Sequence, residues 1–169
     1  HKAKIIHRDI NPNNIFICRS GVVKLFDFGA ARFEQTDMST VLTPHYAPPE
    51  QYRTKSKQGA QTDIYAVGAT MYFALTGIKP EESTDRQHKD KLVPPMKLNN
   101  TIPKSISNAI MRAMALKPEL RFKNAADFQK ALQSMNAVRD VEEEIKRRRL
   151  YRFAQAGVIT VIFAAGAGV

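Results

Sequence analysis

Apolar residues near the start of the chain fall into two short runs separated by a turn. Residues 14–18 and 22–26 are rich in β-branched and aromatic side chains, and the stretch 19–21 between them ends in a glycine. This pattern predicts a β-hairpin. Cys18 lies in the first run, and we expect it to be a small buried apolar side chain. The next stretch, residues 27–50, is more polar and predicts a long loop.

A longer apolar pattern over residues 62–76 predicts a helix. The positions that recur at helical spacing are Ile64, Val67, Gly68, Met71 and Leu75. Most residues between them are apolar too, and a helix that is apolar nearly all round lies in the interior of a domain. Thr62 or Asp63 is placed to cap its N-terminus, and Gly77 is placed to end it.

The remainder of the predicted domain is helical, with one polar connection. Residues 79–103 are polar and contain prolines, so we expect a solvated surface with at most a short helix near 84–89. A second helix is expected to begin near residues 102–105. A third is expected over 124–135, with Asn124 as its N-cap. The predicted fold class is therefore mainly α with a short β-hairpin.

The composition changes after residue 135. Residues 136–152 are charged and end in a basic cluster made of Lys146, Arg147, Arg148, Arg149 and Arg152. Residues 154–169 carry no charge, and these 16 residues are fewer than the roughly 20 that span a bilayer. We interpret residues 153–169 as the start of a transmembrane helix. Basic residues on its N-terminal side predict that the preceding domain lies in the cytoplasm, attached to the cell membrane by a single pass.

The net charge of +10 is compatible with a nucleic acid, an anionic lipid surface or an acidic substrate. Its densest run directly precedes the apolar segment, which favours a membrane surface. The run has no interleaved aromatic residues and matches no nucleic-acid-binding motif, so we expect no nucleic-acid partner. The single cysteine excludes an internal disulfide.

Three polar side chains around the predicted hairpin suit metal-assisted phosphoryl transfer. Asp9 is able to orient a substrate hydroxyl and accept its proton. Asn14 and Asp27 offer the oxygen ligands that magnesium prefers. A hairpin brings its two ends together, so Asn14 at its start and Asp27 at its end are expected to face one site. Phosphoryl transfer demands mainly positioning and charge neutralisation, which these groups supply.

The same residues form motifs in a fixed order. Residues 7–14 and 27–29 resemble the H-R-D-x-x-x-x-N catalytic loop and the D-F-G motif of protein kinases. Residues 48–50 resemble the A-P-E motif, and Thr43 and Pro44 stand where Ser/Thr kinases receive substrate. On these motifs, residues 1–135 are identified as a protein-kinase-like C-terminal lobe. The whole chain is similar to bacterial, eukaryotic-like (Hanks-type), membrane-anchored Ser/Thr protein kinases.

The resemblance implies a role for each matching residue. Asp9 would be the catalytic base for transfer from ATP to protein hydroxyls. Asn14 and Asp27 would bind Mg2+ and, through it, ATP. Thr43 and Pro44 would form the substrate-side loop.

Three further hydroxyls are candidates for regulation. The predicted loop contains three candidate phosphorylation sites, Thr40, Ser39 and Thr36. We prefer Thr40 and Ser39 to Thr36. The resemblance makes Arg8 the partner of a loop phosphate, through a charge-assisted contact. Each hydroxyl alone is equally well explained as ordinary loop polarity.

Two structural contacts also follow from the resemblance. Glu50 would form a buried ion pair with Arg121, tying the loop to the lobe, and removing one partner of such a pair costs about 3–5 kcal/mol. Asp63 would brace the backbone of the catalytic loop from the start of the buried helix. An exposed Arg121 or a plain N-cap Asp63 are the simpler alternatives.

In the family, a Gly-rich loop, a strand lysine and a helix glutamate precede the catalytic loop. Here the catalytic loop begins at residue 7, and no G-x-G-x-x-G occurs in the sequence. We therefore expect a C-terminal lobe fragment that transfers no phosphate by itself. Related kinases often activate by pairing, which leaves a homodimer open.

Asn11 is the main departure from the family pattern. Ser/Thr kinases usually carry a lysine there, which neutralises the transferring phosphate, whereas asparagine donates a hydrogen bond without charge. We expect slower turnover than in a lysine-bearing relative. The alternative functions are a pseudokinase or scaffold lobe and, ranked last, a nucleic-acid-binding protein. The presence of Asp9, Asn14 and Asp27 favours the enzyme.

Overall fold

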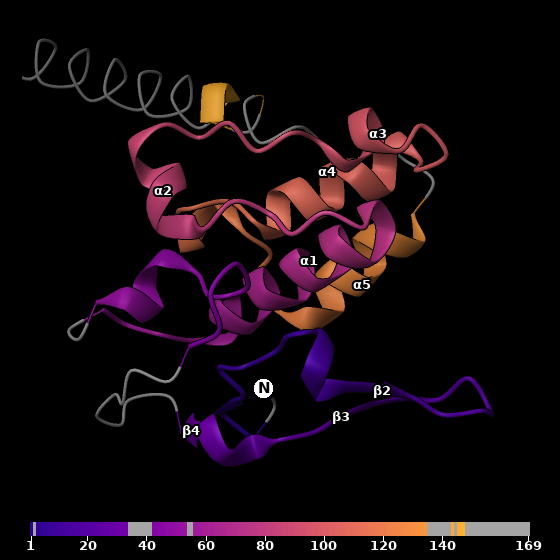
Figure 1. The fold of residues 1–169 in the computed structure, drawn as a ribbon. Helices are drawn as coiled ribbons and strands as arrows, with labels where there is room; N and C mark the ends of the chain where they lie inside the picture. The colour runs from indigo at the N-terminus through magenta and orange to yellow at the C-terminus, as the bar shows by residue number, and fades with distance from the viewer. Residues whose placement is uncertain (2, 34–41, 54–55, 135–142, 144, 148–169) are drawn as a thin grey trace, which may run out of the picture.

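A computed structural model describes residues 1, 3–33, 42–53, 56–134, 143 and 145–147. The N-terminal part contains two small antiparallel sheets, and helices form the rest of the described chain (Figure 1). Strands β2 (Ile15–Ile17) and β3 (Val23–Leu25) make the predicted hairpin, with Ile15 opposite Leu25. A second sheet pairs β1 (Ile5–Ile6) with β4 (Arg32–Phe33). The sequence pattern missed β4, which lies inside the predicted loop.

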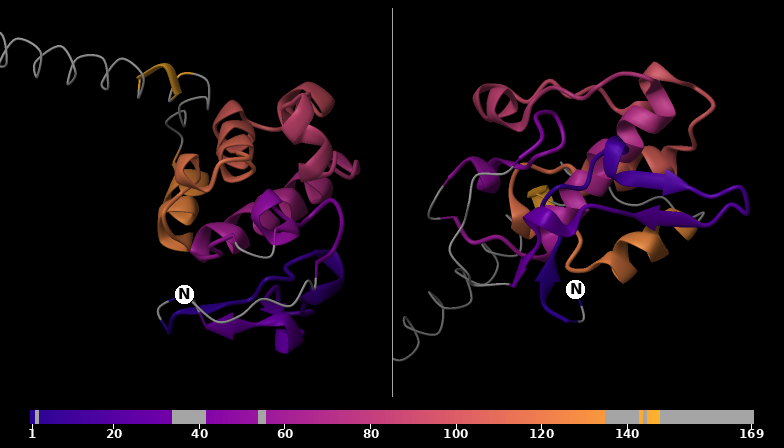
Figure 2. Two further views of the ribbon diagram at one scale, coloured as in Figure 1. Left: turned by 90° about the vertical axis from the view of Figure 1, so that its left-hand side faces the viewer. Right: turned by 60° about the horizontal axis from the view of Figure 1, so that its bottom comes forward.

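The hairpin extends away from the helices (Figure 2), and its apolar side chains are largely exposed. Phe16 is 56% exposed, Ile17 69% and Val23 63%. Cys18 is partly buried, so the prediction of a buried cysteine is wrong. The reason is that a two-stranded ribbon is covered only where another element packs on it.

Helix α1 (Ala60–Thr76) is the central element of the helical part (Figure 1). It contacts β1, α3, α4 and α5, and nine of its residues are buried, as its apolar pattern predicted. The helix begins two residues before the predicted start. Gly59 is the N-cap, and its N–H donates to Thr62 Oγ1 at 3.2 Å, so Thr62 takes part in the capping box from the third helical position rather than as the N-cap residue itself. Gly77 ends it at φ +71°, as predicted.

Helix α4 (Lys104–Ala113) packs closely against α1. The approach is made possible by Gly68, because a Cβ at this position would lie 2.9 Å from Ala113 Cβ. Helix α5 (Ala125–Gln133) packs against both α4 and α1, and Asn124 caps it by accepting a hydrogen bond from Asp127 N. Phe128 of α5 is buried and stacks on Phe122 with ring centres 5.0 Å apart.

The polar connection between α1 and α4 has more structure than expected. It contains α2 (Ser83–His88), which matches the short helix expected near 84–89, and a short α3 (Pro95–Leu98), which the pattern missed. His88 is exposed as expected, but the Arg86 side chain is only 1% exposed. Its guanidinium is accommodated because it pairs with Asp90 at 2.9 Å and donates to Tyr65 Oη at 3.0 Å. The expectation of a solvated surface is therefore wrong at Arg86.

Short 3-10 helices join these elements in the described chain: η1 (Pro12–Asn14), η2 (Phe28–Ala30), η3 (Pro49–Tyr52) and η4 (Pro118–Leu120). Within the described ranges, no helix has both the length and the apolar character needed to cross a membrane. The predicted transmembrane start at 153–169 and most of the charged segment 136–152 lie outside the described residues.

Candidate active site

The backbone of the predicted catalytic loop is held by one carboxylate of α1. Asp63 Oδ2 accepts a hydrogen bond from His7 N at 2.9 Å, and Asp63 Oδ1 accepts one from Arg8 N at 2.9 Å. Arg8 has φ +72°, a left-handed conformation that is unfavourable for a non-glycine residue. The two hydrogen bonds stabilise this conformation from a position 55 residues further along the chain.

Asp63 is 3% exposed, and its electrostatic environment reflects that position. Burial raises the pKa of Asp63 above its usual value, because an ionised carboxylate loses hydration inside the protein. The hydrogen bonds from the backbone of Arg8 and His7 act in the opposite direction and lower the pKa. Burial has the larger effect, so the net direction of the change in pKa is upward.

The Asp9 carboxylate is oriented by hydrogen bonds to both of its oxygens. Asn14 Nδ2 donates to Asp9 Oδ2 at 3.0 Å and to the Asp9 carbonyl at 2.8 Å. Thr43 Oγ1 donates to Asp9 Oδ1 at 2.5 Å. Asp9 Oδ1 also accepts from Asn11 Nδ2, whereas Oδ2 accepts from Asn14 Nδ2. A carboxylate oxygen is able to accept two hydrogen bonds, so Oδ2 keeps acceptor capacity for a further hydroxyl.

Asn11 lies in the same network. Its Nδ2 is 3.0 Å from Asp9 Oδ1 and 3.3 Å from Thr43 Oγ1. Asn11 is only 3% exposed and brings no charge to the site. Its amide therefore connects the catalytic loop to the substrate-side loop and leaves an approaching phosphate without a cationic partner at this position.

The hairpin brings the predicted metal ligands to one end, as the sequence predicted. Phe26 N donates to the Asn14 carbonyl at 2.8 Å, and Asp27 is the next residue. Asn14 uses its Nδ2 on Asp9, which leaves its Oδ1 for a cation. Asp27 has a left-handed backbone at φ +55°, and its Oδ1 accepts from Gly29 N at 3.1 Å.

One amide oxygen and one carboxylate fit a magnesium ion that takes its other ligands from phosphates and water. Among the residues that the structure describes, no three His, Cys, Asp or Glu side chains form a metal-binding group.

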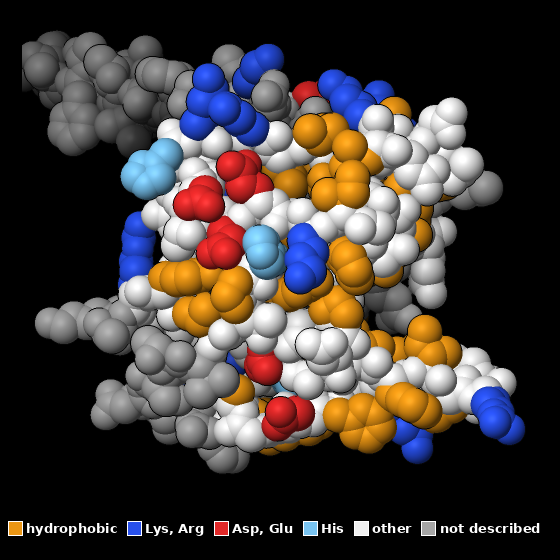
Figure 3. Space-filling model, viewed as in Figure 1, with side chains coloured by type: hydrophobic (Ala, Val, Ile, Leu, Met, Phe, Trp, Pro, Cys, Tyr) orange, Lys and Arg blue, Asp and Glu red, His pale blue; other side chains and the backbone are white. Residues whose placement is uncertain are grey.

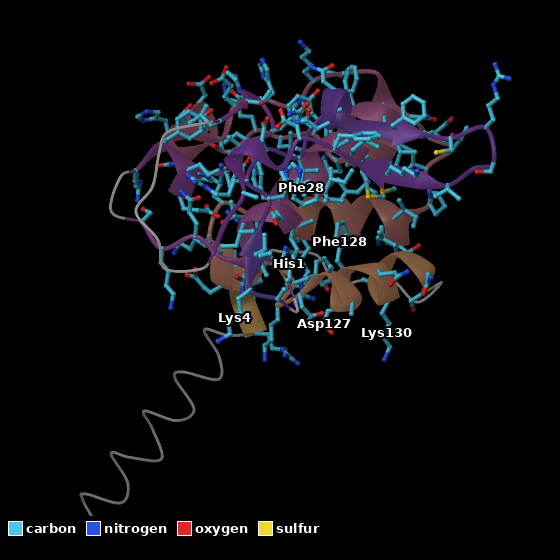
Figure 4. The ribbon with its side chains drawn as sticks, turned by 90° about the horizontal axis from the view of Figure 1, so that it is seen from below. His1, Lys4, Phe28, Asp127, Phe128 and Lys130 are labelled. Atoms are coloured by element: carbon cyan, nitrogen blue, oxygen red, sulfur yellow. The ribbon has the colours of Figure 1, made fainter. Side chains whose placement is uncertain are left out.

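His7 connects the catalytic loop to the D-F-G segment. Its Nε2 donates to the Phe26 carbonyl at 2.8 Å, and its ring contacts the Phe28 ring with centres 4.7 Å apart. Phe28 lies at the end of the molecule that carries the hairpin, whereas Asp127 and Lys130 lie on α5 at the opposite end (Figure 4). The contacts of His7 thus join the two motifs to each other.

The substrate-side loop forms a tight turn over residues 43–47. Tyr46 N and Ala47 N both donate to the Thr43 carbonyl. The segment before α2 supports the turn, since His45 Nδ1 contacts the Pro80 carbonyl at 2.9 Å and Ser83 Oγ donates to the Ala47 carbonyl at 2.8 Å. Sequence reasoning missed Ser83, because residues 79–103 carry no motif.

Glu50 and Arg121 form the ion pair that the resemblance implied. Arg121 Nη1 lies 2.6 Å from Glu50 Oε1, and the Arg121 side chain is fully buried. Arg121 also donates from Nε to the Ala115 carbonyl at 2.7 Å. Its guanidinium stacks over the Tyr65 ring, 5.0 Å from the ring centre. The pair therefore joins the end of the substrate-side loop to α1 and to the segment after α4.

Arg8 is anchored by two glutamines that sequence reasoning did not identify. Its Nε donates to Gln58 Oε1 at 2.8 Å, and its carbonyl accepts from Gln51 Nε2 at 2.7 Å. Neither glutamine belongs to a motif, so no signal in the sequence pointed to them. The candidate phosphorylation sites Thr36, Ser39 and Thr40 lie outside the described residues.

Comparison with known proteins identifies the relatives of this site. The profile of the protein kinase domain matches residues 1–141. A probable serine/threonine-protein kinase of Clostridium perfringens is 34% identical over 141 residues, which are 76% of this chain and 20% of that protein. The tyrosine-protein kinase MasK of Myxococcus xanthus is 33% identical over 141 residues, which are 77% of this chain and 22% of MasK.

A solved structure, the apo form of PpkA-294, has the same arrangement with a TM-score of 0.66 and 31% identity. The match covers 79% of this chain and 48% of that one. The chain thus spans about a fifth of the length of the two curated relatives and about half of this solved structure.

Proposed function

The chain belongs to the protein kinase domain family, and we propose that it is the C-terminal lobe of a serine/threonine protein kinase. The reaction would move the terminal phosphoryl group of ATP to a hydroxyl of a protein substrate. The observation that carries this proposal is the Asp9 carboxylate, held by Asn14 and Thr43 at 3.0 and 2.5 Å beside the hairpin end that bears Asp27.

In this proposal each residue has a defined task. Asp9 orients the substrate hydroxyl and accepts its proton, and Thr43 fixes the carboxylate. Asn14 Oδ1 and Asp27 would hold Mg2+, which supplies charge neutralisation for the phosphates when it is bound. The positioning of these groups supplies the main catalytic effect of the chain, because phosphoryl transfer depends chiefly on alignment and electrostatics.

The acceptor is proposed to be Ser or Thr. The support is Thr43, which the turn over residues 43–47 places against Asp9, together with the relative that is named a serine/threonine-protein kinase. The similarity to a protein named a tyrosine kinase makes tyrosine the second candidate acceptor. Peptides that differ only in having Ser, Thr or Tyr at one position separate the two.

We also propose that the apolar segment 153–169 begins a single membrane pass with the kinase lobe on the cytoplasmic side. The support is the sequence alone: an uncharged segment directly after a basic cluster at residues 146–152. Tethering raises the effective concentration of neighbouring copies, which favours a homodimer. A cell-fractionation assay of the gene product with and without residues 153–169 tests the attachment.

The catalytic proposal is tested on the gene product as its host makes it. Transfer of labelled phosphate from ATP to a Ser/Thr peptide mixture should require Mg2+ and should be lost in Asp9→Asn. Asp85→Asn changes an exposed carboxylate on α2 and should leave transfer unchanged. Residues 1–169 alone should transfer nothing.

A pseudokinase is the second candidate, favoured by the uncharged Asn11. Binding of ATP with Mg2+ and equal, negligible transfer in the wild type and Asp9→Asn would establish it. Loss of nucleotide binding in Asp27→Asn, measured by calorimetry, separates a nucleotide site from a scaffold that binds no nucleotide.

A further inference from the structure

We propose that Gln58 is a positioning residue for phosphoryl transfer. It orients the side chain of Arg8 and, through Arg8, the backbone of the loop that carries Asp9. This inference rests on the proposed kinase function and deepens it, because it names a buried neutral amide, in place of a phosphate, as the partner that sets the catalytic loop. The contacts and the burial of Arg8 carry it.

Arg8 is held by three different segments of the chain. Its N–H donates to Asp63 Oδ1 of α1 at 2.9 Å, and its carbonyl accepts from Gln51 Nε2 of η3 at 2.7 Å. Its Nε donates to Gln58 Oε1 at 2.8 Å, and Gln58 directly precedes Gly59, the N-cap of α1. Two of these contacts hold the backbone of Arg8, and the contact with Gln58 holds its side chain.

The contact between Arg8 and Gln58 lies inside the protein. Both residues are 4% exposed, and Gln51 is 3% exposed. A buried donor that loses its acceptor is costly, because bulk water does not reach it to take the place of the lost partner. The Oε1 atom of Gln58 therefore fixes the direction of the Nε–H bond of Arg8.

Gln58 occupies an edge of the Arg8 guanidinium that is suited to a phosphate. A bidentate contact with a phosphate uses two parallel N–H groups on one edge, and the Nε–H is already directed at Gln58 Oε1. A phosphate dianion also loses far more hydration than an amide when it enters a buried site. The sequence resemblance implied a loop phosphate as the partner of Arg8, whereas these contacts favour Gln58.

The orientation of Arg8 matters for the chemistry because Asp9 is the next residue. Arg8 has a left-handed backbone at φ +72°, and such a conformation persists where the surroundings maintain it. Asn14 Nδ2 and Thr43 Oγ1 reach the Asp9 carboxylate at 3.0 and 2.5 Å, so a small movement of the loop disturbs both contacts. A misplacement of about 1 Å is able to cost about a hundredfold in rate. Because Gln58 acts through Arg8, its loss should lower kcat and leave the KM of the peptide nearly unchanged.

The test uses the gene product as its host makes it and a Ser/Thr peptide that it phosphorylates. Gln58→Met keeps nearly the length of the side chain and removes the acceptor, and it should lower kcat by about tenfold or more. Gln58→Glu keeps an acceptor for the Nε–H of Arg8 and should retain most of kcat. Gln58→Asn withdraws the acceptor by one methylene and should lower kcat even if Gln58→Met does not fold.

Gln87→Met is the matched control. Gln87 is exposed on α2, and its Oε1 accepts from Arg53 Nη2 at 2.8 Å, so it makes the same type of contact at the surface. Acidic side chains gather over α2 on the face that Figure 3 shows, which places the control in a solvated, polar part of the molecule. The control should leave kcat unchanged.

A double variant tests the route through Arg8. If Gln58 acts through Arg8, Gln58→Met should cause no further loss of kcat when Arg8→Met is already present. Multiplied losses in the double variant, or an unchanged kcat in Gln58→Met, would overturn the inference. Phosphatase treatment of the wild type should leave kcat unchanged, and a loss of activity on this treatment would make a phosphate the partner of Arg8 and overturn it as well.

The outcome separates this inference from the proposed function. No transfer by the wild type to any peptide contradicts the kinase. In that case, hydrogen–deuterium exchange of the backbone amides of residues 5–12 still decides the role of Gln58. Exchange should be faster in Gln58→Met than in the wild type and Gln87→Met, and equal exchange in all three would overturn the inference.

Discussion

Arg121 donates to both carboxylate oxygens of Glu50, from Nη1 at 2.6 Å and from Nη2 at 2.9 Å, across 71 residues of sequence. Both side chains are buried. The pair connects the segment that follows the substrate-side loop to the helical part. The attraction between the two charges adds little net stability to the folded state, because both charges lose hydration on burial. Removal of one partner is costly, since the other charge then stays buried and uncompensated.

The first prediction concerns this pair. Arg121→Met should lower the free energy of unfolding by about 3–5 kcal/mol, because the buried charge of Glu50 would lose its cationic partner and keep only the hydrogen bond from Thr62 Oγ1. Glu50→Gln should have a smaller effect, since the amide oxygen still accepts from Arg121 and the guanidinium keeps the Ala115 carbonyl. Urea unfolding of the two variants measures both. An Arg121→Met effect below about 1 kcal/mol, the range of an exposed pair, would contradict the buried assignment.

The second prediction concerns the uncharged amide beside Asp9. Asn11→Lys should raise kcat, because a cation at this position neutralises the transferring phosphate. Asn13→Lys adds the same charge at an exposed neighbouring position and should leave kcat unchanged. Steady-state phosphorylation of a saturating peptide gives both values. A clear fall of kcat in Asn11→Lys would mean that its bridge from Asp9 to Thr43 matters more than charge.

The third prediction concerns pH and the buried carboxylate of Asp63. Its pKa in the folded protein lies above that of the unfolded chain, so proton uptake favours the folded state. This contribution is fully present below the unfolded pKa of about 3.9 and is lost as pH rises through the raised folded pKa. Asp63→Asn should remove it and should also leave one backbone N–H of the catalytic loop without an acceptor, which costs about 1–3 kcal/mol.

The corresponding measurement is the free energy of unfolding of the wild type and Asp63→Asn as a function of pH. The difference between them should widen as pH falls from neutral toward the unfolded pKa. Asp127→Asn, which alters an exposed carboxylate on α5, serves as control and should not reproduce the trend. A constant difference across this range would show that the pKa of Asp63 is not raised.

The fourth prediction concerns the contact between α1 and α4. Gly68→Ala should destabilise the domain by about 1–3 kcal/mol, because its Cβ would lie 2.9 Å from Ala113 Cβ. The second substitution Ala113→Gly removes the opposing atom and should recover part of the loss in the double variant. Thermal unfolding of the two single variants and the double variant tests this coupling. Additive effects would place the two helices further apart than the structure does.

Much of the fold follows from local patterns. The hairpin, the buried helix and the caps at Gly77 and Asn124 were predicted because periodicity and capping residues act within a few positions. The second sheet was missed because β1 and β4 are two residues each and pair across 26 residues of chain. The start of α1 was misplaced because the N-cap residue is Gly59, which accepts from Thr62 N with its backbone carbonyl and has no polar side chain to mark the position.

The candidate site was predictable where a motif fixes the chemistry and unpredictable where tertiary contacts do. The approach of Asn14 to Asp27 could be predicted because a hairpin necessarily joins its ends, and Asp9 could be chosen because it stands in the motif of residues 7–14. Gln58 and Ser83 could not be predicted from the sequence, since each contributes one hydrogen bond to a segment far away in the chain. The burial of Arg86 was also missed, because an arginine with two partners has the same sequence signature as an exposed one.

The Asp63 contacts have a consequence for the order in which this molecule acquires its shape during synthesis. The catalytic loop leaves the ribosome some 55 residues ahead of the carboxylate that holds its backbone. Until α1 has emerged and become helical, the left-handed conformation of Arg8 has no acceptor to stabilise it. A ribosome stalled before residue 63 would therefore carry every atom of Asp9 and Asn14 in a loop that has not yet taken its final form.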